Sequence, residues 1–148
     1  MTGKLLIMYG TETGNSEHLA IDAQKLASGH GMDAQVKAMD ELSIDEISTY
    51  ENVVIVCSTW GDGEQPDNAQ ELFDDFTESP DCCLEGVNFA VLALGDSAFD
   101  MFCQSGIEWD EIFEKKHGNR VNKRIDCDTD YQDYAEEWIN ETLKLIKI

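Results

Sequence analysis

The chain has 148 residues, of which 42% are hydrophobic, enough for one domain with its own core and too many for a disordered chain. It carries 10 basic and 31 acidic residues, which gives a formal net charge of −21. So negative a protein repels nucleic-acid phosphates and anionic membrane surfaces, so neither is an expected partner. The composition therefore predicts a single domain, residues 1–148, that recognises neither nucleic acid nor lipid.

Strand-like and helix-like segments alternate along the whole chain, which is typical of an α/β sheet. Five strands are predicted, over residues 4–9, 32–39, 52–58, 87–94 and 120–127. Helices are predicted where apolar residues recur at i, i+3, i+4 and i+7, as do Ala69, Leu72, Phe73 and Phe76. The same kind of pattern marks helices around residues 19–27, 109–113 and 135–146, and the first of these is expected to stop at Gly29.

The composition of the strands predicts their order. Segments 4–9, 52–58 and 87–94 are continuous apolar runs, as expected of strands covered on both faces. Segment 32–39 alternates apolar and polar residues and segment 120–127 is basic, so both are predicted to be edges. Edges at the second and fifth strands favour a five-stranded parallel sheet in the order 2-1-3-4-5. The ligand crevice of such a sheet is expected at the carboxyl ends of strands 1 and 3.

The loop after the first strand suits a phosphate. Gly10 and Gly14 allow close backbone approach, and Thr11, Thr13 and Ser16 supply hydroxyl groups. The N–H groups at the start of the following helix attract an anion. No Lys follows the second glycine and the G-x-G-x-x-G pattern is absent, so the loop is neither a Walker loop nor a dinucleotide fingerprint. It fits one phosphate monoester better than a triphosphate with magnesium; a plain capped turn is the alternative.

The run Thr11-Glu12-Thr13-Gly14-Asn15-Ser16 resembles the FMN phosphate loop of flavodoxins, and the element order and length resemble that family over the whole chain. The resemblance implies a flavodoxin-like α/β fold, a three-layer sandwich with helices on both faces of the sheet. It also implies noncovalently bound FMN. The phosphate would be held by four side chains and two backbone amides: those of Thr11, Thr13, Asn15 and Ser16, and those of Glu12 and Gly14.

Residues 58–63, after the third strand, place a Trp between polar residues and two glycines. Such a Trp is expected to stack on an aromatic ligand at the crevice; the alternative is packing on a neighbouring helix. The match to flavodoxins implies that Trp60 covers the inner face of the isoalloxazine ring. It also implies that the Gly61 peptide turns its carbonyl toward the flavin N5–H on one-electron reduction. Three further residues of this loop would line the site: Ser58, Thr59 and Asp62.

The Gly95-Asp96-Ser97 opening of the loop after the fourth strand resembles the third flavodoxin loop, whose backbone contacts the pyrimidine edge of the ring. The outer stacking position, usually Tyr, falls on Phe99, which keeps the aromatic ring and lacks the hydroxyl. Met101 or Phe102 is the alternative cover. The backbone would face the polar edge of the ring near three residues: Asp62, Asp96 and Cys103.

With both ring faces covered, the resemblance implies an electron-transfer protein and not an enzyme. The expected role is a monomeric one-electron carrier between redox proteins (reductases, oxidoreductases or cytochromes) that dock through basic surfaces. The alternative is an FMN-dependent quinone or flavin reductase of the same fold, which needs a substrate pocket over the ring. No metal site is expected.

The N-terminus lacks the apolar run of a signal peptide, and the five cysteines, odd in number, form no C-x-x-C pair. A cytoplasmic protein with reduced thiols is therefore expected.

The acidic residues near the loops predict a low reduction potential. One carboxylate about 10 Å from the ring raises the energy of a reduced anion by roughly 0.4–1.7 kcal/mol, or roughly 20–70 mV, for effective dielectric constants of about 80 to 20. The carboxylates expected near the ring are Asp62, Glu64, Asp67, Asp96 and Asp100.

Overall fold

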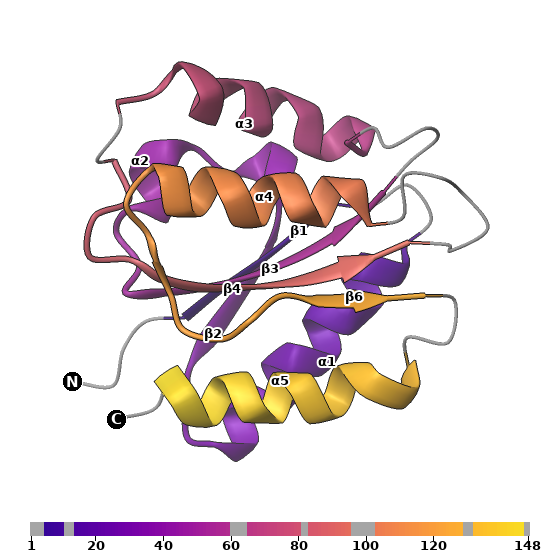
Figure 1. The fold of residues 1–148 in the computed structure, drawn as a ribbon. Helices are drawn as coiled ribbons and strands as arrows, with labels where there is room; N and C mark the ends of the chain where they lie inside the picture. Colours follow the sequence, from indigo (N-terminus) through magenta and orange to yellow (C-terminus); the bar gives the residue numbers. More distant parts are fainter. Residues whose placement is uncertain are drawn as a thin grey trace.

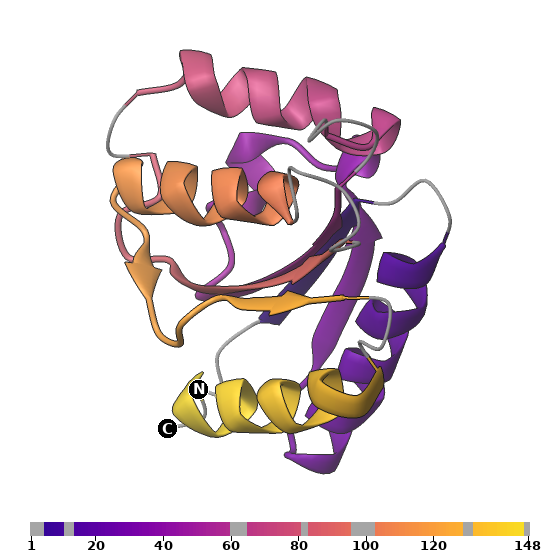
Figure 2. The ribbon, with the colours of Figure 1, turned by 45° about the vertical axis from the view of Figure 1, so that its right-hand side comes forward.

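The computed structural model describes residues 5–10, 14–59, 65–80, 83–95, 103–128 and 132–146. A central sheet lies between two layers of helices, α3 and α4 on one face and α1 and α5 on the other (Figures 1 and 2). The elements in chain order are β1 (Leu5–Gly10), α1 (Asn15–Gly29), β2 (Ala34–Ala38), the 3-10 helix η1 (Met39–Glu41), α2 (Ile44–Ile47), β3 (Asn52–Ser58), α3 (Asp67–Glu78), β4 (Asn88–Leu94), α4 (Gln104–Lys115), β5 (Asn119–Arg120), β6 (Ile125–Cys127) and α5 (Gln132–Ile146).

The strands pair in the order β2-β1-β3-β4, and β5 and β6 both pair with β4 on its far side. All pairs are parallel. This arrangement confirms the predicted order and both predicted edges. Helix α1 ends at Gly29 as expected, although the residue that takes the left-handed conformation is Gly31, with φ of 77°.

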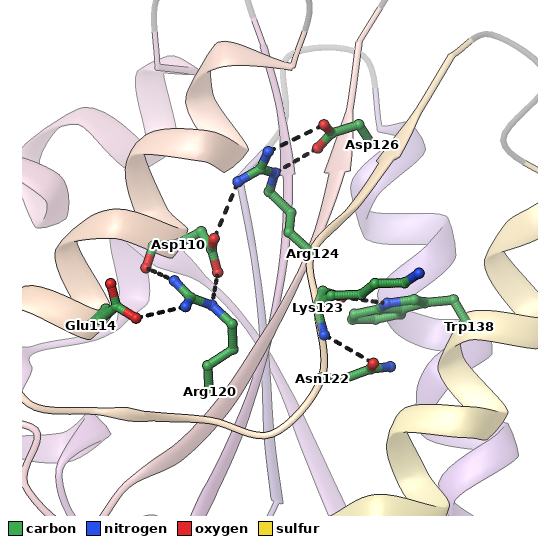
Figure 3. Close-up of polar contacts among 8 residues, drawn as sticks. All are labelled: Asp110, Glu114, Arg120, Asn122, Lys123, Arg124, Asp126 and Trp138. Carbon is green, nitrogen blue, oxygen red and sulfur yellow. Dashed lines mark hydrogen bonds and ion pairs between the residues drawn. The ribbon is translucent and has the colours of Figure 1, made fainter.

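The predicted fifth strand is interrupted. The backbone of Lys123 makes its hydrogen bonds outside the sheet. Its N–H donates to the Asn122 side chain at 2.9 Å, and its carbonyl accepts from the Trp138 indole N–H at 2.9 Å (Figure 3). These groups are therefore satisfied without a strand partner. The segment predicted over residues 120–127 thus becomes two short strands at one edge position.

Two hydrophobic cores lie on the two faces of the sheet, because successive side chains of a strand point to opposite faces. On β1, Leu5 and Ile7 pack into the core under α1 and α5, whereas Leu6 and Met8 pack into the core under α3 and α4. All four side chains are fully buried. The apolar runs of the central strands are thereby explained by burial on both faces.

One carboxylate holds the interrupted edge of the sheet against α4. Asp110 accepts from Nε of Arg120 at 2.9 Å and from Nη1 of Arg124 at 3.1 Å, and its side chain is only 9% exposed (Figure 3). Arg120 also pairs with the exposed carboxylate of Glu114 at 2.6 Å, and Arg124 with Asp126 at 2.7 Å. Asp110 is therefore the shared partner of two arginines.

Replacing Asp110 with Asn is expected to lower the free energy of unfolding by about 2 kcal/mol, because two half-buried guanidinium groups lose their shared charged partner. Glu114→Gln is the matched control: it removes an exposed ion pair to the same Arg120, worth at most about 1 kcal/mol. Urea unfolding of the two variants measures both effects. Equal losses in the two variants would contradict a special role for the buried carboxylate.

Candidate functional site

The carboxyl ends of β1, β3 and β4 lie at the same edge of the sheet, where the three predicted ligand loops begin (Figure 1). Of the predicted site residues, the structure describes Gly14, Asn15, Ser16, Ser58, Thr59, Gly95 and Cys103. The others lie outside the described residues: Thr11, Glu12, Thr13, Trp60, Gly61, Asp62, Asp96, Phe99, Met101 and Phe102.

The first turn of α1 and the end of β3 meet through two hydroxyl groups. Ser16 lies in the first turn of α1 and is fully buried, and its Oγ lies 2.6 Å from Oγ of Ser58 at the end of β3. Two hydroxyls in such contact are held in fixed positions, and each keeps hydrogen-bonding capacity for a further partner. The structure thus brings together two residues that lie 42 positions apart in the sequence.

The start of α1 is suited to an anion. Its N-cap is Gly14, with φ of 90° and no side chain to cap the helix. The first backbone N–H groups of an α-helix have no intrahelical partner, and they lie at the positive end of the helix dipole. Beside them stand the hydroxyls of Ser16 and Ser58. This part of the site combines amide and hydroxyl donors in the pattern that binds phosphate groups.

Thr59, at the start of the second loop, is bonded to β4 and to α4. Thr59 donates its backbone N–H to the Leu94 carbonyl at 3.0 Å, and its Oγ1 accepts from the Ser105 N–H at 3.0 Å. Thr59, the residue that follows β3, therefore caps the first turn of α4. Gly95 donates its N–H to the Cys127 carbonyl at 2.9 Å, and a Cβ on Gly95 would lie 2.8 Å from the backbone nitrogen of Cys103. Only glycine allows this close approach.

Burial raises the pKa values of two thiols beside the site. Burial raises the pKa of the Cys103 thiol to about 12, and the negative charge of Asp126 adds to the shift. Burial also raises the pKa of Cys57, on β3, well above its usual range. Because the thiolate is the nucleophilic form, these raised pKa values favour unreactive, protonated thiols at neutral pH.

FMN fits the described donors. Its phosphate is a monoester dianion, which amide and hydroxyl donors at a helix N-terminus can bind without a metal ion. The seven described residues of the predicted site include no Lys and no Arg. A triphosphate would need more positive charge than these residues offer. The donor set thus favours one phosphate group on an otherwise weakly charged ligand.

Gln65, which the sequence analysis did not single out, also borders this region. Its side chain is polar and only 5% of the residue is exposed. A glutamine in a loop segment gives no sequence signal for burial, because its partners lie on a helix about forty residues later in the chain.

Comparison with known proteins agrees with this geometry. The flavodoxin family profile matches residues 7–138. The sulfite reductase [NADPH] flavoprotein alpha-component of Bacillus subtilis is 38% identical over 141 residues, which are 95% of this chain and 23% of that protein. The Vibrio cholerae protein of the same name is 34% identical over 146 residues, 99% of this chain and 24% of that protein. The chain thus spans about a quarter of the length of these curated relatives.

Solved structures share the fold over nearly the whole chain. A cysteine mutant of flavodoxin from Pseudomonas aeruginosa is 30% identical, with a TM-score of 0.84 and coverage of 97% of this chain and 98% of that one. Streptococcus pneumonia TIGR4 flavodoxin shares the fold with a TM-score of 0.86 at 20% identity, covering 97% of each chain. Among the helices of the described residues, none combines the length and the apolar character that crossing a bilayer requires. The matches in sequence and fold agree with the predicted resemblance, and the chain belongs to the flavodoxin family, whose cofactor is FMN.

Proposed function

We propose that this chain is a low-potential one-electron carrier that binds FMN noncovalently and passes electrons between redox proteins. The observation that carries the proposal is the contact of the buried Ser16 hydroxyl with the Ser58 hydroxyl at the glycine-capped start of α1. When bound, FMN supplies the redox chemistry, and the protein supplies binding, orientation and electrostatics. The donors at the start of α1 would fix the phosphate, and the later loops would enclose the ring.

The proposed binding residues divide into two groups. The phosphate group comprises Thr11, Glu12, Thr13, Gly14, Asn15, Ser16 and Ser58. The ring group comprises Thr59, Trp60, Gly61, Asp62, Gly95, Asp96, Phe99, Met101, Phe102 and Cys103, with Trp60 and Phe99 as the two covers. Support for the division comes from the described members: Ser16 and Ser58 contact each other, while Thr59 and Gly95 contact the segments beside β4 and α4.

Anaerobic reduction of the FMN-loaded chain distinguishes a carrier from the rival quinone or flavin reductase. A carrier is expected to take up two electrons in separate one-electron steps with well separated potentials. It is also expected to show no saturable turnover with quinones. A single two-electron step together with rapid, saturable quinone reduction would contradict the proposal and favour the reductase.

Removing the Ser16 hydroxyl should weaken FMN binding selectively. In Ser16→Ala the charged phosphate loses the hydrogen bond that the Ser16 hydroxyl would donate. This loss costs about 1.5–2 kcal/mol, or roughly 10–30-fold in dissociation constant. Fluorescence titration of the apoprotein measures this loss.

Two controls accompany the Ser16 variant. Ser43→Ala removes a serine that caps α2 outside the site and should leave FMN affinity unchanged. Riboflavin, which lacks the phosphate, should bind Ser16→Ala as it binds the unmodified chain. A Ser16→Ala variant that binds FMN with unchanged affinity would remove this residue from the phosphate site.

We also propose that residues 1–148 form one domain, which is monomeric and cytoplasmic and whose partners dock through basic surfaces. The net charge of −21 supports basic partners. The free thiols of Cys57, Cys83, Cys103 and Cys127 support a reducing compartment. The names of the relatives suggest one specific setting, in which the chain delivers electrons that originate from NADPH to a sulfite-reducing partner.

Docking to basic partners predicts strong salt dependence. Electron transfer from the reduced chain to cytochrome c, used as a basic acceptor probe, should slow roughly tenfold or more between low salt and about 0.5 M salt, because attraction between the surfaces is screened. Stopped-flow absorbance measures the rate, and a small neutral acceptor serves as the control. A rate to cytochrome c that is independent of salt would contradict docking by charge.

A further inference from the structure

Gln65 ties the chain that follows the second loop to α4. Its Oε1 accepts from the Trp109 indole N–H at 2.9 Å and from the Cys57 thiol at 3.6 Å. Its Nε2 donates to the Ser105 carbonyl at 3.3 Å and to Oε1 of Glu108 at 3.1 Å. Both donor positions of the Gln65 amide and the acceptor position facing Trp109 are thus used. The Cys57 thiol lies between two acceptors, because its Sγ is also 3.5 Å from the Ser58 carbonyl. A buried amide with partners on both its oxygen and its nitrogen is held in one orientation.

Thr59 ties the chain that precedes the same loop to the same turn of α4. Its Oγ1 accepts from the N–H of Ser105, the residue whose carbonyl accepts from Gln65. The residues on either side of positions 60–64 are therefore both bound to Ser105. Positions 60–64 include the proposed inner ring cover, Trp60.

The start of α4 is a rigid anchor for these ties. Trp109 is fully buried and meets Phe73 and Phe76 edge-on, with ring centroids 5.1 and 5.8 Å apart. Gly106 is packed so closely on β4 that an added Cβ would lie 3.0 Å from the Ala93 Cα. Because α4 begins where the third loop ends, at Cys103, its first turn is bonded to the second loop and covalently joined to the third.

We infer that Gln65 and Thr59 are positioning residues for the flavin ring: they bind both ends of the second loop to the first turn of α4 and so set that loop in register with the third. The inference rests on the proposed function. It adds Gln65 to the residues that act in ring recognition, and it gives Thr59, already in the ring group, a positioning role. Loss of either tie lowers the fraction of molecules in which the two loops are correctly placed, and the apparent affinity falls by that fraction.

The test uses three variants of the whole chain and one control variant. Gln65→Met and Thr59→Val remove the ties while keeping side-chain volume, and Thr59→Ser keeps the hydroxyl. Thr142→Val is the matched control, because Thr142 is a buried threonine on α5 that accepts a hydrogen bond from Asn122 at 2.9 Å, away from the three loops. Dissociation constants for FMN and riboflavin are measured on each apoprotein, together with urea unfolding and the visible circular dichroism of bound FMN.

We expect the dissociation constants of FMN and riboflavin to rise by the same factor, about tenfold, in Gln65→Met and Thr59→Val. The ratio of the two constants then stays as in the unmodified chain, whereas Ser16→Ala changes it. The visible circular dichroism at saturation changes in both variants, and Thr59→Ser restores it. Thr142→Val loses stability and keeps both affinities.

Two results would overturn the inference. One is unmodified flavin affinity and circular dichroism in Gln65→Met and Thr59→Val; the other is an equal loss in Thr142→Val, which would indicate a general effect of stability. If Gln65→Met does not fold, the comparison of Thr59→Val with Thr59→Ser still tests the inference. A failure of the proposed function is distinguishable, because the unmodified chain itself would then bind no flavin.

Discussion

Replacing Gly106 with alanine is expected to lower the free energy of unfolding by about 3 kcal/mol or more. A Cβ at this position would lie 2.2 Å from the Ala93 Cβ and 3.0 Å from its Cα. Ala93 is fully buried on β4, and this strand is paired on both sides. The backbone of β4 therefore cannot shift away from α4 to make room for the added Cβ. Helix α4 would have to move instead, and the better helix propensity of alanine, worth about 1 kcal/mol, does not offset that movement.

Gly29→Ala is the matched control for this variant. Gly29 is also helical, and an added Cβ there meets nothing within 4 Å, so the substitution should be neutral or stabilise by at most about 1 kcal/mol. Urea unfolding followed by far-ultraviolet circular dichroism compares the two. A Gly106→Ala protein as stable as Gly29→Ala would show that the packing of α4 on β4 is looser than the structure indicates.

FMN is expected to raise the melting temperature of the apoprotein strongly. A ligand that binds only the native state stabilises it by about 4 kcal/mol at about 1,000 times its dissociation constant. For a chain of this size that corresponds to roughly 8–16 °C. Thermal scans of the apoprotein with and without excess FMN measure the shift, and the Ser16→Ala variant should show a smaller one at equal FMN. Superimposable scans of the unmodified chain would contradict specific binding.

The order of the strands could be predicted because burial leaves a direct mark on composition. Strands covered on both faces are continuously apolar, and the two edge strands are not. No feature of the composition of residues 120–127 predicts the interruption between β5 and β6. It depends on hydrogen bonds of Lys123 with Asn122 and with Trp138, and the indole comes from a helix that begins after the strand has ended.

The candidate site could be predicted as three loops and not as a set of contacts. Gly14 and Ser16 were recognisable because close backbone approach and hydroxyl donors require particular residue types. The capping of α4 by Thr59 was not, because the helix and its cap lie 46 residues apart in the sequence. Gln65 was missed for the same reason, since a polar loop residue usually faces water and this one is buried among partners on β3 and α4.

The central claim is that the chain recognises FMN, with its phosphate as a principal contact. Titration of the apoprotein with FMN and, in parallel, with riboflavin, followed by quenching of flavin fluorescence, tests it most directly. We predict that FMN binds with a dissociation constant at least about tenfold lower than that of riboflavin, because the donors at the start of α1 engage the phosphate. Equal affinities for the two flavins, or no binding of FMN, would contradict the claim.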